Sequence, residues 1–140
     1  MAQGENVTVL VLVGSLRAAS INRQLAELAV ETAPAGVVLE WFDRLGELPF
    51  YNEEIDTDEV AEPVAALRDV AARAGAALVI TPEYNGTIPG VLKNAIDWLS
   101  RPWGNGALKD KPVAVVGAAL GQYGGAWAHD ETRKSIGIAG

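Results

Sequence analysis

Hydrogen-bonding side chains gather directly behind an apolar segment near the N-terminus. Val7–Val13 is rich in β-branched residues and is ended by Gly14. The residues that follow include Ser15, Arg17, Ser20 and Asn22. Short polar side chains beside the free N–H groups of a helix start, together with a guanidinium, are suited to bind a phosphate. The alternative is an ordinary capped turn with a solvated arginine.

The spacing of this loop narrows the choice of phosphate ligand. It contains neither the G-x-G-x-x-G of dinucleotide-binding domains nor the G-K-[ST] ending of loops that bind nucleoside triphosphates. We therefore expect a mononucleotide phosphate at residues 14–22.

A second polar loop follows the apolar segment at residues 76–81. It contains Pro82, Glu83, Tyr84, Asn85 and Gly86. The proline and the Asn-Gly pair restrict the backbone, so that the tyrosine and several main-chain donors form a surface for a flat ring with polar edges. A rigid turn before a helix is the alternative. Glu83 is the obvious candidate for a general acid or base, but carboxylates near helix starts are common for structural reasons, and we assign it no catalytic role.

A third loop is rich in glycine. Residues 117–125 begin at Gly117 and contain four glycines in nine positions. Glycines let a backbone approach a ligand closely, but they also make a simple flexible crossover. The loop therefore indicates a ligand site only in combination with the other two loops.

The elements between these loops alternate in type. Apolar segments at residues 7–13, 37–42, 76–81 and 112–118 predict four strands, and helical periodicity at residues 21–32, 60–74 and 88–99 predicts helices between them. Arg101-Pro102 stops the third helix, and a fourth is expected from about Ala126. This alternation is typical of an α/β fold with a doubly wound parallel sheet. Ligands of such sheets bind beyond the carboxyl ends of the strands, where all three loops lie.

Composition excludes several classes of function. The 140 residues form one expected domain, 1–140, with no cysteine and one histidine, so thiolate or multi-histidine metal sites are excluded. A net charge of -7 disfavours nucleic acid and anionic membrane surfaces as partners. The longest apolar segment is too short for a transmembrane helix, and the N-terminus lacks the basic part of a secretory signal. We expect a cytoplasmic protein with no metal.

Taken together, the three loops resemble the NADPH-dependent FMN reductase family, flavodoxin-like flavoproteins that include chromate, quinone and azo-dye reductases. The resemblance rests on G-S-L-R-x-x-S-x-N at residues 14–22, P-E-Y-N-G at residues 82–86 and I-P-G-V-L-K-N-A-I-D-W at residues 88–98. It implies that the first loop (Ser15, Arg17, Ser20, Asn22) holds the FMN phosphate, that the second (82–86) wraps the isoalloxazine, and that Gly117 lies at the cofactor. It also implies the strand order 2-1-3-4-5 and a homodimer or tetramer.

Family members continue with a fifth strand and a last helix, which this sequence lacks after Gly140. We therefore expect a chain shortened at its C-terminus, or a partner that covers the fourth strand. The acidic connection at residues 44–59 is either functional or a solvated loop.

The implied activity is an FMN-dependent NAD(P)H oxidoreductase that works by a ping-pong mechanism. NADPH or NADH donates the hydride, the flavin carries the chemistry without a catalytic side chain, and a flavin, quinone, azo or chromate-type small molecule accepts the electrons. Arg101 is a candidate for binding the 2′-phosphate of NADPH. The alternatives are a flavodoxin-type electron carrier, which would not oxidise NAD(P)H, and an interaction domain that no longer binds flavin.

Overall fold

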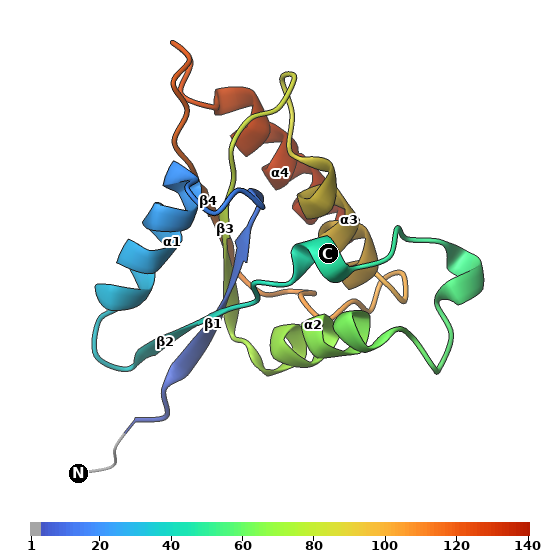
Figure 1. Ribbon diagram of the computed structural model, residues 1–140. Helices are drawn as coiled ribbons and strands as arrows, with labels where there is room; N and C mark the ends of the chain where they lie inside the picture. Colours follow the sequence, from blue (N-terminus) through green and yellow to red (C-terminus); the bar gives the residue numbers. More distant parts are fainter. Residues whose placement is uncertain (1–3) are drawn as a thin grey trace.

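A computed structural model describes residues 4–140, so Met1, Ala2 and Gln3 of the N-terminus lie outside it. Its sheet has four parallel strands in the order β2-β1-β3-β4 (Figure 1). The strands are β1 (Val7–Val13), β2 (Val37–Trp41), β3 (Ala76–Ile80) and β4 (Val113–Val116). The doubly wound parallel sheet and its flavodoxin-like order are thus confirmed for these strands.

The helices are α1 (Ile21–Glu31), α2 (Glu62–Arg73), α3 (Gly90–Leu99) and α4 (Ala126–Ala139). Helix α3 begins two residues later than the periodicity predicted. Ile88 precedes Pro89, and the proline ring disfavours the α conformation in the residue before it. None of the helices in residues 4–140 is long and apolar enough to cross a membrane.

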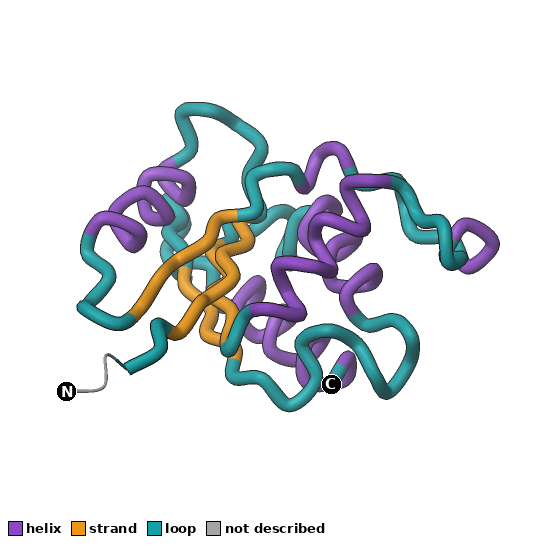
Figure 2. The backbone as a smooth tube through the Cα atoms, turned by 90° about the horizontal axis from the view of Figure 1, so that it is seen from below, coloured by secondary structure: helices purple, strands orange, loops and turns teal. Residues whose placement is uncertain are grey.

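The sheet is covered unequally on its two faces. Helix α1 lies on one face, where Val11, Val13, Ala26 and Ile80 form a small buried cluster. The other three helices lie on the opposite face over a much larger core, so that the strands form a layer between them (Figure 2). Strand β1 is therefore buried on both sides, as its continuous hydrophobicity predicted, whereas Val116 in the outer strand β4 remains 41% exposed.

The acidic connection at residues 44–59 contains two short 3-10 turns, η1 (Leu45–Glu47) and η2 (Glu53–Ile55), and its first half is packed, whereas most of residues 52–59 are exposed. The indole N–H of the fully buried Trp98 donates to the Pro49 carbonyl at 2.7 Å. The N–H of Tyr51 donates to the Asn94 side-chain oxygen at 2.8 Å. These bonds fix the connection onto α3, and the sequence had not indicated such anchoring.

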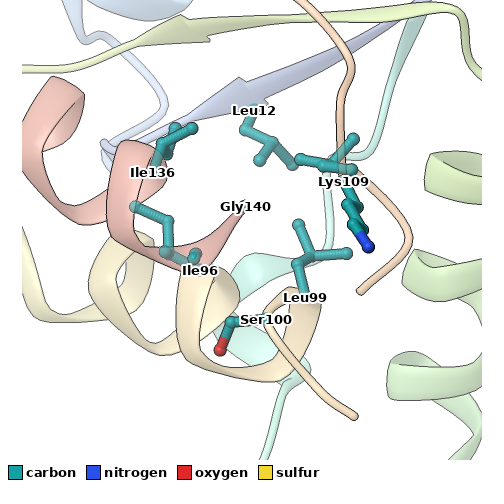
Figure 3. Close-up of a pocket in the computed structure, with 9 residues that line it drawn as sticks. Leu12, Ile96, Leu99, Ser100, Lys109, Ile136 and Gly140 are labelled. Carbon is teal, nitrogen blue, oxygen red and sulfur yellow. The ribbon is translucent and has the colours of Figure 1, made fainter. Parts of the chain in front are cut away.

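A small cavity lies between β1, α3 and α4 (Figure 3). Leu12, Ile96, Leu99, Ile136 and Gly140 are among the residues that line it. Its volume is about 20 Å³, which is room for one water molecule at most. This cavity is a packing imperfection and is too small for a nucleotide.

Candidate functional site

A much larger pocket lies beyond the carboxyl ends of β1, β3 and β4. It measures about 510 Å³, a size typical of sites for small molecules and cofactors. Most of the residues that the sequence predicted for the site line it, namely Ser15, Arg17, Ser20, Asn22, Pro82, Glu83 and Tyr84. The structure thus brings all three polar loops to one pocket.

The first loop shapes one end of this pocket around the start of α1. Ser20 caps the helix, and its hydroxyl accepts a hydrogen bond from the N–H of Asn22 at 3.2 Å. The hydroxyl of the buried Ser15 accepts from the N–H of Arg17 at 3.4 Å. The guanidinium of Arg17 is exposed and forms no ion pair with any residue of the described chain. A free cation next to the positive end of a helix dipole favours an anion at this end.

Asn22 has a further role that the sequence did not reveal. Its side-chain oxygen accepts from the N–H of Ala118 at 2.8 Å, and its side-chain nitrogen donates to the Ala118 carbonyl at 3.1 Å. The side chain is buried, so these two bonds join the start of α1 to the glycine-rich loop. Asn22 therefore fixes the relative position of two walls of the pocket.

The second loop forms a tight turn at another part of the pocket wall. The backbone groups of Tyr84 and Thr87 exchange hydrogen bonds at 2.9 and 3.1 Å. Between them, Asn85 and Gly86 have positive φ angles of 52° and 78°, as a type I′ turn requires. Asn85 and Gly86 do not line the pocket. They shape the turn that presents the half-exposed Tyr84 to it.

Glu83 caps helix α4 from a distance in the sequence. One carboxylate oxygen accepts from the N–H of Ala128 at 3.1 Å, in the first turn of this helix. The N-cap position of α4 is Gly125, which has no side chain to supply a capping group. The starts of α1 and α4 both border the pocket, but α4 already has a carboxylate at its positive end. A phosphate is therefore favoured at α1, beside Arg17, over α4.

Gly117 allows the ends of β3 and β4 to approach each other. A Cβ atom at this position would lie 2.1 Å from the Thr81 carbonyl oxygen, well inside van der Waals contact. Gly117 is not one of the residues that line the pocket. Its close approach to β3 sets the direction in which the rest of the glycine-rich loop leaves the sheet.

Arg101 lies in a different depression, at the end of α3. Its guanidinium carbon is 5.5 Å from the ring centroids of both Tyr51 and Trp103, and its Nε donates to the Tyr51 hydroxyl at 3.2 Å. It does not line the pocket that contains Arg17. The structure does not bring Arg101 to the other predicted site residues of the same chain.

The sequence had missed several residues of the glycine-rich loop. The pocket is also lined by Leu120, Gly121, Tyr123, Gly124 and Gly125. The sequence does carry a signal for Tyr123: it is an aromatic residue among glycines, immediately before a helix, and it belongs to no strand or helix itself.

Comparison with known proteins decides the family. The sequence pattern of the family described as NADPH-dependent FMN reductase matches residues 7–140. The chain belongs to this family. The reductase is 44% identical to a quinone reductase from Pseudomonas putida over 129 residues, which cover 92% of this chain and 69% of that enzyme. It is 42% identical to a 2-hydroxy-1,4-benzoquinone reductase from Burkholderia sp. over 125 residues, which cover 89% and 67%.

A solved structure agrees with this assignment. The flavoenzyme FerB of Paracoccus denitrificans, an NAD(P)H:(acceptor) oxidoreductase, superposes with a TM-score of 0.88 and is 39% identical. The match covers 96% of the reductase and 72% of FerB. The family consists of oxidoreductases that use FMN and take a hydride from NAD(P)H.

The pocket is chemically suited to FMN. Its lining offers Arg17 and the start of α1 to a phosphate, and Tyr84 and a type I′ turn to a flat ring. The glycines of the third loop lack side chains that would keep a ligand away from the backbone. The residues present thus fit a mononucleotide with a planar ring system.

Proposed function

We propose that this reductase is an NAD(P)H:quinone oxidoreductase that holds FMN in the pocket of about 510 Å³. The observation that carries the proposal is that one pocket combines two kinds of binding group. Arg17, which forms no ion pair within the described residues, and the start of α1 can bind a phosphate, and the exposed Tyr84 on a rigid turn can pack on a flat ring. The quinone reductases among its relatives support quinones as the acceptors.

The proposed roles follow the geometry. Arg17 and the N–H groups at the start of α1 bind the phosphate, and Ser15 and Ser20 shape the loop around it. Pro82, Glu83 and Tyr84, together with the turn at Asn85 and Gly86, border the isoalloxazine. Asn22 and Gly117 keep the three loops together at the ends of the strands.

When bound, FMN supplies the redox chemistry, since it can accept a hydride and pass on two electrons. In the overall reaction NAD(P)H, one proton and the quinone give NAD(P)⁺ and the hydroquinone. The sequence offers one phosphate-binding loop, at residues 14–22, which FMN would fill, so we propose that donor and acceptor use the pocket in turn, in a ping-pong cycle. Free flavin, azo compounds and chromate belong to the wider range of acceptors that we propose for this site.

Steady-state kinetics test the ping-pong cycle. Initial rates are measured at several fixed concentrations of a quinone while the NADPH concentration is varied, and then with NADH. Parallel double-reciprocal lines are expected if donor and acceptor use the pocket in turn. Lines that intersect would mean that donor and acceptor are bound together, and the proposed order would be wrong.

We also propose a cytoplasmic homodimer. NAD(P)H is a cytoplasmic reductant, which supports the location. Phe50 and Trp103 are 84% and 65% exposed, so apolar surface is available to a second copy, whereas Trp98 of α3 is fully buried in the core. Light scattering coupled to size exclusion tests the assembly: we expect about twice the 14.7 kDa of the chain, and a monomer at micromolar concentration would contradict it.

A further inference from the structure

Two exposed aromatic side chains stand together at the rim of the pocket. The rings of Tyr123 and Trp127 have centroids 5.9 Å apart and planes inclined by 32°. Their side chains are 65% and 56% exposed, and Tyr123 lines the pocket. Exposing two large aromatic surfaces to water is unfavourable, so core packing does not account for their place beside a ligand pocket.

The backbone holds this pair in a defined position. Gly124 and Gly125, between the tyrosine and the helix, have φ angles of 59° and 80°, which side-chain-bearing residues adopt only with strain. The N–H of Ala126 donates to the Tyr123 carbonyl at 3.1 Å and closes this turn. The ring of Tyr123 is therefore set by the start of α4 and does not hang from a free loop.

The pair is also joined to the wall that carries Tyr84. A Cβ atom on Gly86 would lie 3.4 Å from the six-membered ring of Trp127, so the indole packs directly on the type I′ turn. The bond from the Ala128 N–H to the Glu83 carboxylate holds the same two segments together. Trp127 thus packs against both the ring of Tyr123 and the turn, and it links the two.

We propose that Tyr123, positioned by Trp127, is a stacking platform that selects planar, uncharged aromatic acceptors such as quinones. This inference rests on the proposed function and specifies which electron acceptors the pocket prefers. An aromatic ring attracts another ring through dispersion and its quadrupole, and gives no comparable gain to a compact inorganic ion. The net charge of -7 acts in the same direction, because it disfavours anionic acceptors at long range.

The test compares two acceptors on the FMN-loaded protein, 2-methyl-1,4-naphthoquinone and ferricyanide. In Tyr123→Leu the KM for the quinone is expected to rise about two- to tenfold, the range given by one aromatic pair. The ratio of kcat/KM for the quinone to kcat/KM for ferricyanide, measured at one NADPH concentration on protein matched for bound FMN, is expected to fall by the same factor. Tyr123→Phe, which keeps the ring, is expected to restore the quinone KM, and Trp127→Leu to raise it less than Tyr123→Leu does.

Phe50→Leu is the control, because it removes an aromatic ring that is even more exposed, 84% against 65%, and lies outside this pocket. A second readout is independent of turnover: calorimetric binding of 2-naphthol, a planar compound that accepts no electrons, is expected to weaken in Tyr123→Leu and not in Phe50→Leu. An unchanged quinone KM and unchanged naphthol affinity in Tyr123→Leu would overturn the platform. If wild-type protein fails to reduce the quinone at all, the proposed function is wrong, and the naphthol titration still decides whether the platform binds aromatic rings.

Discussion

Removing the Glu83 carboxylate separates a structural role from a direct role at the cofactor. The side chain accepts one hydrogen bond, from the Ala128 N–H at 3.1 Å, and this bond caps a helix whose own N-cap is a glycine. Loss of a side-chain cap costs about 0.5–2 kcal/mol. A negative charge near a helix start contributes about 0.3–1 kcal/mol through the helix dipole.

These magnitudes give a graded series of variants. For a domain of this size 1 kcal/mol shifts Tm by about 4 °C. Glu83→Ala loses both contributions, so its Tm is expected to fall by about 3–12 °C. Glu83→Gln keeps an acceptor oxygen and loses the charge, so a fall of about 1–4 °C is expected.

The assay is thermal unfolding of the apoprotein, followed by circular dichroism, in parallel with FMN titration by fluorescence. Glu54→Ala is the matched control, because the Glu54 side chain lies on the exposed η2 turn and caps no helix. The apoprotein is essential, since bound ligand would itself raise Tm. If Glu83→Ala leaves the apoprotein Tm unchanged while FMN affinity falls, Glu83 acts at the cofactor and the capping role is refuted.

Further variants test the phosphate end, the close approach of strands and the pH dependence of folding. Arg17→Met is expected to weaken FMN binding about ten- to hundredfold, as loss of a charge-assisted contact predicts, with no change in apoprotein Tm, whereas Arg101→Met should leave FMN affinity unchanged. Gly117→Ala should lower the free energy of unfolding by about 1–3 kcal/mol, because its methyl group meets a carbonyl oxygen. Gly137→Ala, in open space on α4, should raise the free energy of unfolding by about 0.5–1 kcal/mol. Urea unfolding of the two variants distinguishes these effects. Hydrogen bonds from Arg44 lower the pKa of Glu62 below its ordinary value of 4.5. The Glu62 carboxylate therefore stabilises the fold above pH 4.5, and this contribution disappears as the pH falls through the lowered pKa. The Tm difference between wild type and Glu62→Gln should accordingly be present at pH 7 and vanish in acid, and a difference that persists at acidic pH would contradict a stabilising ion pair.

Local patterns sufficed for most of the fold. Val7–Val13 was predicted to the residue, because a continuous β-branched apolar segment of this length strongly favours a buried strand and Gly14 ends it. Ser20, one of the short polar residues expected beside a helix start, caps α1. The predicted start of α3 was early, because apolar periodicity continued through Ile88 and outweighed the effect of Pro89 on its neighbour. Such errors at element ends leave the topology unaffected.

Contacts between distant segments could not be predicted in the same way. Asn22 and Ala118 are 96 positions apart, and only the folded sheet brings the amide to that backbone. Glu83 likewise caps a helix 45 positions further along the chain. In each case the side chain lines the pocket where the three loops meet, but its partner depended on how two crossovers end at the same edge of the sheet.

The central claim is that the pocket holds FMN and that NADPH reduces it there. The most direct measurement is the visible absorption spectrum of purified protein that has been incubated with FMN, desalted, and then mixed with NADPH under anaerobic conditions. We predict that flavin absorbance is retained after desalting and bleaches on addition of NADPH, and that Arg17→Met loses the flavin during desalting. Retained flavin that NADPH does not bleach would identify an electron carrier instead, and a wild-type protein that retains no flavin would contradict the assignment of this pocket.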